Sequence, residues 1–307
     1  MSAAGGGGTR AIIAALAANL GIALTKFLAY LLTLSSSMLA ESIHSVADST
    51  NQVLLLVGGK RAERDATPKH PFGYGRERYI YAFVVSVVLF AVGGLFAIYE
   101  GVEKIAHPEP ISEWEWVPLA VLAVAIALES FSFRTAIQEA NRVREGASWV
   151  RYIRRARAPE LPVVLLEDFA ALIGLLLAFL GVGLTLATGH GLWDGIGTLT
   201  IGGLLVGVAV VLAVETKSLL IGESATADQI AAIEAAINSQ DEVCRLIHMR
   251  TLHLGPEELL VAAKIAVPGE ESAARVAAVI DEVELRIRKA VPIAKVIYLE
   301  PDIDREA

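Results

Sequence analysis

The sequence contains a single cysteine, Cys244, and lacks the short motifs of ATP-driven and hydrolytic proteins. With one thiol, a disulfide framework and a thiolate metal cluster are both excluded. A GxxxxGKS/T phosphate-binding loop is absent, which argues against an ATP-driven pump, and an HExxH metalloprotease motif is absent as well. Because no positive signal for catalysis is left, we expect a protein that is not an enzyme.

Charge is also scarce relative to apolar residues. Of the 307 residues, 20% are charged and 54% are hydrophobic, and the mean hydropathy is +0.55. This composition is too apolar for an ordinary soluble protein and predicts several membrane spans. The net charge of −8 says little about nucleic acid, and the basic residues sit beside the apolar runs, so no nucleic-acid partner is expected.

Six apolar runs are long enough to cross the hydrocarbon core of a bilayer. They lie at about residues 11–33, 36–59, 79–101, 115–137, 161–187 and 195–215. The linkers 60–78 and 138–160 are rich in Lys and Arg, whereas the loops on the opposite side are nearly free of cations. Since short basic loops stay cytoplasmic, we predict a multi-pass protein of the cell (inner) membrane with both termini in the cytoplasm.

The excess of apolar residues ends near residue 215 and divides the chain. Residues 1–10 are predicted to form a flexible tail, without the basic region and cleavage site of a signal peptide. Residues 11–215 are predicted to form an all-α transmembrane domain of six helices. Residues 216–307 read as helix, strand, strand, helix and strand, which predicts a cytoplasmic α+β domain of ferredoxin-like type. A domain this short buries only a modest core, so dimerisation through it is expected.

The second apolar run carries three ionisable residues, Glu41, His44 and Asp48. At this spacing their side chains project from one face of a helix. An ionisable residue at membrane depth costs roughly 2.5–3.5 kcal/mol by insertion scales unless it is paired, solvated or bound to metal. His44 and Asp48 are one turn apart, a geometry that binds a divalent cation from a single helix. The alternative is a buried polar pair that holds two helices together.

The first span carries two polar residues of its own, Asn19 and Lys26. In a hairpin with the second span, Lys26 lies at about the depth of Glu41 and is expected to neutralise it. Asn19 lies at about the depth of Asp48 or Asn51. This arrangement leaves the histidine and the aspartate of the second span as the candidate ligands.

Acidic residues also occur in the fourth and fifth spans. Glu129 lies roughly two turns from the cytoplasmic end of its helix, and Glu167 and Asp168 lie at a similar depth in theirs. Acids buried at one level in two spans indicate a shared aqueous cavity rather than two separate accidents.

Two motifs resemble those of the cation diffusion facilitators, the zinc-transporter family. Residues 39–48, LAESIHSVAD, are similar to the second-span signature of the family, and residues 70–76, HPFGYGR, to the short motif before its third span. The pair Glu167-Asp168 followed by Gly174 resembles the fifth span, and the tail resembles the cytoplasmic domain of the family. The resemblance covers the chain from about residue 11 and is strongest to the branch that contains zinc transporter nine.

The resemblance implies a homodimeric exporter of divalent metal in the lipid bilayer, with Zn²⁺ as the expected substrate, protons as counter-ion and alternating access as the mechanism. It also implies two ligands from the second span, matched by His44 and Asp48, and two from the fifth. Asp168 matches one of these, but the other position holds Val164, which cannot bind metal. Glu167 is the expected replacement, although it lies about 100° around the helix from Asp168. Glu129, Glu41 and water are alternatives at this position. The residues expected around the ligands, or in a proton relay, are Glu41, Glu129, Asn19 and Lys26.

Outside the spans the resemblance predicts little metal binding. His70 is retained in the linker motif, but Tyr74 occupies a position where many members have histidine, so a structural role is expected. In the tail, the positions of the metal-binding histidines hold Ile247, Lys264 and Tyr298. Manganese, iron(II) and cobalt remain open as substrates. The alternative functions are a membrane metal sensor or scaffold that holds a structural ion, and a transporter of another substrate such as an organic cation.

Overall fold

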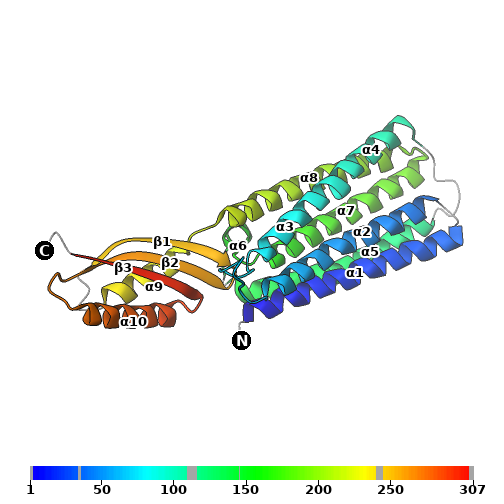
Figure 1. Ribbon diagram of the computed structural model, residues 1–307. Helices are drawn as coiled ribbons and strands as arrows, with labels where there is room; N and C mark the ends of the chain where they lie inside the picture. Colours follow the sequence, from blue (N-terminus) through cyan, green and yellow to red (C-terminus); the bar gives the residue numbers. More distant parts are fainter. Residues whose placement is uncertain (1–2, 34–35, 109–115, 145, 240–244, 304–307) are drawn as a thin grey trace. The chain divides into compact units, whose positions relative to one another are not determined.

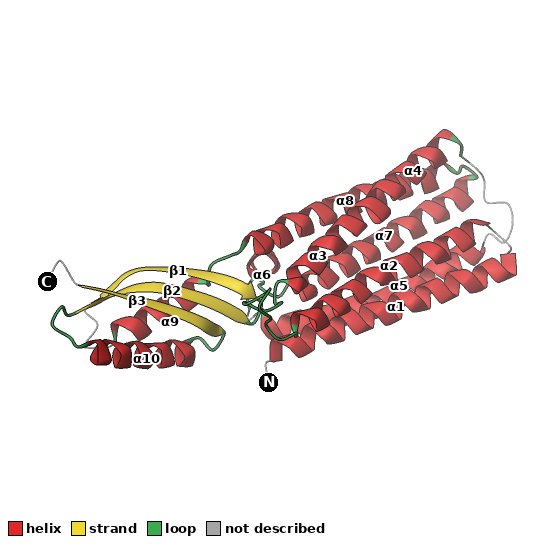
Figure 2. Cartoon of the chain, in the orientation of Figure 1, coloured by secondary structure: helices red, strands yellow, loops and turns green. Residues whose placement is uncertain are grey.

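A computed structural model describes residues 3–33, 36–108, 116–144, 146–239 and 245–303 (Figure 1). The chain forms two compact units, one helical and one of mixed α and β structure (Figure 2). The first unit consists of Met1–Arg61 and Glu77–Lys217, and the second of Ala62–Arg76 and Ser218–Ala307. The linker between the second and third spans therefore groups with the tail.

Long helices make up the first unit. They are α1 (Ala3–Thr33), α2 (Ser36–Ala62), α3 (Glu77–Val88), the π-helical η1 (Leu89–Leu95), α4 (Phe96–Ala106), α5 (Trp116–Val143), the short α6 (Trp149–Arg155), α7 (Glu160–Thr188) and α8 (Leu192–Ile221). The elements α3, η1 and α4 follow one another directly and form one span. α1 begins inside the glycine-rich segment for which the sequence predicts a flexible tail.

Five helical segments within the described residues are long and apolar enough to cross a membrane. They are Gly8–Leu31, Glu77–Ala106, Trp116–Val143, Glu160–Thr188 and Leu192–Ile221. These segments match five of the six predicted spans. The remaining predicted span corresponds to α2, which has the length of a span but is not among the five. Large apolar side chains such as Leu24, Phe131 and Leu180 are exposed, as expected of helices that face lipid.

The core of the helical unit lies where α1, α5 and α7 pack against one another. Small residues such as Ala15, Ala136 and Ala140 are fully buried there and let the helices approach closely. Leu55 of α2 and Leu212 of α8 contribute to the same cluster. α7 thus lies in the interior of the unit, and many of the side chains in its first two turns are buried.

Glycines join the span α3–η1–α4 to α8. A Cβ atom added to Gly101 would lie 2.5 Å from the backbone nitrogen of Leu199, and one added to Gly202 would lie 2.7 Å from that of Ile98. Gly94 and Gly195 meet the opposite helix in the same way. On each helix the two glycines are seven residues apart, so they share one face. We call these four glycines the glycine seam.

The second unit contains α9 (Ala227–Asn238), β1 (Arg245–Gly255), β2 (Glu258–Val267), α10 (Ala273–Ala290) and β3 (Ala294–Ile303). This order agrees with the one predicted from the sequence, and Thr226 and Gln229 form a capping box at the start of α9. The sheet has the order β1-β2-β3, with β1 antiparallel and β3 parallel to β2. Both helices cover one face of the sheet (Figure 2). Alternate residues of β2, among them Val261 and Ile265, are buried in the core with Ile233 and Ile287 from the helices.

Candidate functional site

Seven polar residues from three helices make up the candidate site of the helical unit. α2 carries Asp48, Asn51 and Gln52, α5 carries Glu129 and Ser132, and α7 carries Glu167 and Asp168. Asp48 is half-buried, and the other six are buried. We call these seven residues the polar centre. Asn51 and Gln52 follow Asp48 by three and four residues, and Ser132 follows Glu129 by three, so each of these pairs shares one face of its helix.

Asp168 is fixed by a hydrogen bond from α5. The hydroxyl of Ser132 donates to Asp168 Oδ2 over 2.6 Å, and both residues are buried. Glu129, one turn before Ser132, is only 2% exposed and interacts electrostatically with Asp48, Glu167 and Asp168. The structure therefore brings the acids that the sequence places at one depth within reach of one another's charge.

Glu167 has a different set of partners. Asn51 Nδ2 donates to Glu167 Oε1 over 2.7 Å, and Gln52 Nε2 donates to Glu167 Oε2 over 3.1 Å. Asn19 Nδ2 of α1 donates in turn to Gln52 Oε1 over 3.3 Å. A chain of amide and carboxylate groups thus connects α1, α2 and α7, and both oxygens of Glu167 already accept a hydrogen bond.

Two residues near this chain of hydrogen bonds bear on metal binding. Val164, one turn before Asp168, is fully buried in the apolar core and supplies no donor atom. Asn51 is 2% exposed, and within the described ranges its Oδ1 has no hydrogen-bond partner. Among the side chains that the structure describes, no three from His, Cys, Asp and Glu lie close enough together to hold a metal ion.

Several predicted site residues lie outside this description. The side chains of Glu41 and His44 are not among the described residues, although the backbone of both belongs to α2. The predicted pairing of Lys26 with Glu41 therefore stays a prediction, and Lys26 itself is half-buried on α1. Near this level, α1 and α2 are joined by the hydroxyl of Ser42, which donates to the carbonyl oxygen of Ala23 over 3.0 Å.

An ion pair anchors the first turn of α7 to α3. Arg78 donates to both carboxylate oxygens of Glu160, with Nη2 3.0 Å from Oε2. Glu160 is 5% exposed, so this pair is largely removed from water. Burial, together with the negative charge of Glu160, raises the pKa of Tyr152 on α6 to about 12. This anchor lies two turns from Asp168 and fixes the helix that carries it.

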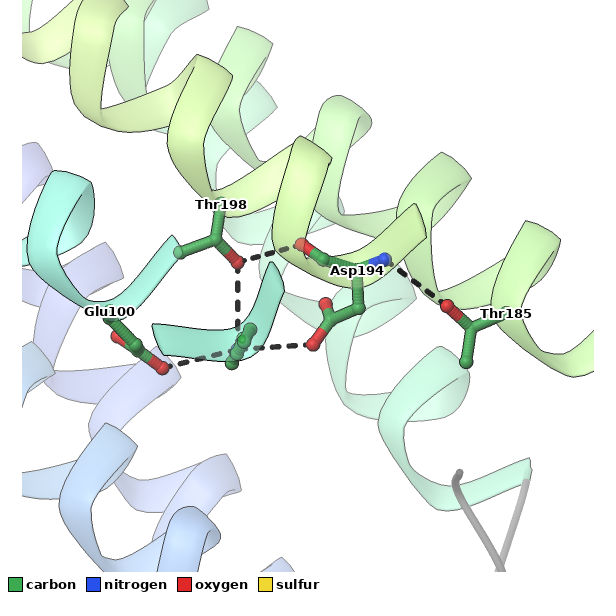
Figure 3. Close-up of polar contacts among 5 residues, drawn as sticks. Glu100, Thr185, Asp194 and Thr198 are labelled. Atoms are coloured by element: carbon green, nitrogen blue, oxygen red, sulfur yellow. Dashed lines mark hydrogen bonds and ion pairs between the residues drawn. The ribbon is translucent and has the colours of Figure 1, made fainter. Parts of the chain in front are cut away.

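Polar residues also gather where α4 and α7 end and α8 begins (Figure 3). Lys104 of α4 lies 3.1 Å from Asp194 Oδ2 of α8 and 3.1 Å from Glu100 Oε1 of its own helix. The backbone N–H of Asp194 donates to Thr185 Oγ1 of α7 over 3.1 Å, and Thr198 Oγ1 donates to the carbonyl oxygen of Asp194. These contacts tie three helix ends together through a charge pair that remains partly exposed.

The linker and tail histidines differ in their surroundings. His70 is exposed, and its ring centroid lies 4.8 Å from that of Tyr74. His253 is buried in β1, with Nδ1 3.4 Å from the carbonyl oxygen of Gly255, whereas His248 is exposed. Lys264 binds Glu300 and Asp302, and these hydrogen bonds raise its pKa.

The sequence did not lead us to assign Asn51, Gln52 or Ser132 to the site. All three are polar residues in predicted spans, and Ser132 follows Glu129 by three residues, which puts these two on one helix face. That spacing was the available signal. Nothing local in the sequence indicates that Gln52 and Asn51 bond the same carboxylate.

Comparison with known proteins gives matches over most of the chain. The family of the cation efflux transmembrane domain matches residues 12–221, and that of the cation efflux protein cytoplasmic domain matches residues 225–302. The "Proton-coupled zinc antiporter SLC30A9, mitochondrial" of Xenopus laevis is 34% identical over 247 residues, which are 80% of this chain and 44% of that protein.

Two further relatives come from a plant and a bacterium. "Metal tolerance protein C4" of Arabidopsis thaliana is 29% identical over 85% of this chain and 57% of its own length. The "Cadmium, cobalt and zinc/H(+)-K(+) antiporter" of Bacillus velezensis is 24% identical over 40% of this chain and 39% of its own length. The chain spans under half the length of the Xenopus relative.

Proposed function

Because the chain belongs to the cation efflux family, we propose that it exports divalent metal cations, zinc first among them, in exchange for protons by alternating access. The observation that carries this proposal is the polar centre, which gathers the half-buried Asp48 of α2 and the buried carboxylates of α5 and α7 inside an apolar helical unit. Buried acids at membrane depth are retained where they serve an ion pathway. The family and its named relatives are transporters, not enzymes.

In this proposal the metal ligands are His44, Asp48 and Asp168, with Glu167 as the predicted fourth. Ser132 supports the assignment of Asp168, because ligating carboxylates are themselves held by hydrogen bonds. Glu167 accepts one amide hydrogen bond on each carboxylate oxygen, which leaves a second lone pair on each oxygen for a cation. Glu129, Glu41, Asn19 and Lys26 are proposed to surround the ligands or to relay protons.

Proton exchange follows from the chemistry of the ligands. Imidazole and carboxylate groups bind metal only when deprotonated, so protons on the outer side displace the ion. A histidine nitrogen favours zinc, whereas an oxygen-rich set favours manganese or iron(II). The Xenopus relative is named a proton-coupled zinc antiporter, which supports zinc and protons as the exchanged ions, with cobalt, manganese and iron(II) as secondary substrates.

We further propose six spans, with α2 as the sixth, and both termini in the cytoplasm. α2 crosses the membrane because its polar residues face the other helices and the metal rather than lipid. The tail is proposed to be a ferredoxin-like domain that holds a homodimer together, which agrees with its match to the family's cytoplasmic domain. The cell (inner) membrane remains the proposed location; the Xenopus relative is named mitochondrial. Residues 1–10, 11–215 and 216–307 are proposed as tail, transport domain and cytoplasmic domain.

The experiment is metal flux into proteoliposomes under an imposed pH gradient, with zinc, manganese, iron(II) and cobalt tested in turn. Wild type is compared with Asp168→Ala. Gradient-driven flux of at least one metal, abolished in the variant, supports the proposal. If folded, correctly oriented protein moves none of these metals, the proposal fails in favour of a membrane metal sensor or scaffold.

A further inference from the structure

The amide oxygen of Asn51 is an unusual group in the helical unit. Asn51 is 2% exposed, its Nδ2 donates to Glu167 over 2.7 Å, and its Oδ1 has no hydrogen-bond partner in the part of the chain that is described. Leaving a buried acceptor unpaired is costly, and nearly all buried polar groups avoid it. An acceptor kept in this state is therefore expected to have a partner that binds there, and a cation is one that needs only lone pairs.

The position of Asn51 makes the transported metal a fitting partner. Asn51 follows Asp48 by three residues on α2, so the two side chains lie on one helix face. Its hydrogen bond reaches Glu167 on α7, the residue that precedes Asp168 in the chain. The Asn51 amide therefore lies between the two helices that supply the proposed ligands.

Without the Asn51 amide, the proposed metal ligands are one fewer than the four that a tetrahedral site needs. Val164 is fully buried in the apolar core one turn from Asp168 and has no lone pair to offer. Glu167 accepts an amide N–H group on each oxygen, and its side chain leaves α7 about 100° around the helix from that of Asp168. Within the described side chains, carboxylates alone do not form a metal cluster.

We propose that Asn51 Oδ1, in place of Glu167, is the fourth ligand of the transported cation and that Glu167 holds the Asn51 amide in position. This inference rests on the proposed function. A carboxylate that accepts a hydrogen bond from the far side of a ligand fixes its orientation and makes its donor atom more electron-rich, as outer partners do for ligating histidines. The resulting set is one imidazole nitrogen and three oxygens, which takes zinc and cobalt and is harder than a set with two histidines.

The test is Co²⁺ and Zn²⁺ binding to the full-length protein in detergent, measured by titration and by the visible absorption of bound Co²⁺. Asn51→Leu removes the donor at similar size, and binding is expected to weaken by about tenfold or more, with a changed Co²⁺ spectrum. Asn51→Asp keeps an oxygen in place and is expected to retain binding. Glu167→Gln still offers an oxygen to Asn51 Nδ2 and is expected to bind within a few-fold of wild type.

A second substitution tests whether Asn51→Leu loses binding because a ligand is missing or because the protein misfolds. Val164→His places a donor one turn from Asp168, and combined with Asn51→Leu it is expected to restore binding. Restoration is the result that a purely structural role of Asn51 would not give. Unchanged binding in Asn51→Leu, together with loss in Glu167→Gln, would overturn the inference and make Glu167 the ligand.

The same titration separates this inference from the proposed function. Asp168→Ala is expected to lose binding whichever residue is the fourth ligand. If Asp168→Ala still binds metal at the wild-type affinity, the proposed transport site is wrong. If it loses binding while Asn51→Leu keeps it, the transport site stands and only the role of Asn51 is overturned.

Discussion

The span α3–η1–α4 and the polar centre are joined to their neighbours in opposite ways. The glycine seam brings backbone against backbone, and a single added carbon on Gly101 or Gly202 would collide with main-chain atoms of the facing helix. In the polar centre, side chains of α2, α5 and α7 meet through hydrogen bonds. The glycine seam supplies no side-chain donor atom for a cation, and its helices are too close to shift. The side-chain hydrogen bonds of the polar centre can exchange partners. We therefore expect stability to depend on the first region and metal transport on the second.

The largest effect is expected from filling the glycine seam. In Gly202→Ala the new carbon would lie 2.7 Å from Ile98 N, where neither backbone can give way. Such overpacking costs about 1–3 kcal/mol, which corresponds to a fall of several degrees in the thermal midpoint. The measurement is the fraction of detergent-solubilised protein that stays monodisperse after heating.

The matched control for the seam is the next residue. Gly203 has no atom within 4 Å of an added Cβ, so Gly203→Ala is expected to keep the wild-type midpoint or to raise it slightly through its better helix propensity. If both variants lost stability equally, the close approach of α4 and α8 would not be what holds this span.

An intermediate effect, on function rather than stability, is expected from Ser132→Ala. The substitution removes the hydroxyl that donates to Asp168 Oδ2 over 2.6 Å. Loss of a group that orients a ligand typically weakens metal affinity by about tenfold to a hundredfold. The half-saturating metal concentration for proteoliposome flux is expected to rise accordingly, while the maximal flux stays close to wild type.

Ser86→Ala serves as the control for Ser132→Ala. Ser86 is as deeply buried, but its hydroxyl bonds the carbonyl oxygen of Phe83 in its own helix and lies in another span. Its removal is expected to leave the metal dependence of flux unchanged. If the half-saturating metal concentration rose equally in both variants, loss of any buried hydroxyl would disturb transport. The effect would then not be due to the hydrogen bond to Asp168.

The smallest effect is expected from Lys104→Met. Lys104 pairs with Asp194 and Glu100 while about a third of its side chain stays exposed (36%), and exposed pairs contribute about 0–1 kcal/mol. We expect the thermal midpoint to fall slightly, and less in high salt, with flux unchanged. A large loss of flux with the fold intact would show that transport also depends on the end of α4 and the start of α8, and not on the polar centre alone.

Much of the fold follows from local patterns that can be read along the chain. Apolar runs predict six spans, and five of them match helices that are long and apolar enough to cross a membrane, because a helix satisfies its own backbone groups in lipid. The tail order follows from helical and alternating periodicity and from the Thr226–Gln229 capping box. The break of the third span into α3, the π-helical η1 and α4 was not predicted, since nothing in its apolar composition distinguishes a π turn from an α turn.

For the candidate site, the sequence by itself determined which spans carry ionisable groups and at what depth, because charge in an apolar run is conspicuous and helical spacing assigns its face. The partners were decided only by the tertiary structure. Glu167 and Asn51 are 116 residues apart in the chain, and Ser132 and Asp168 are 36 apart. A hydrogen bond depends on atoms a few ångströms apart on different helices, so the engagement of Glu167 and the open lone pairs of Asn51 emerge only when α2, α5 and α7 pack.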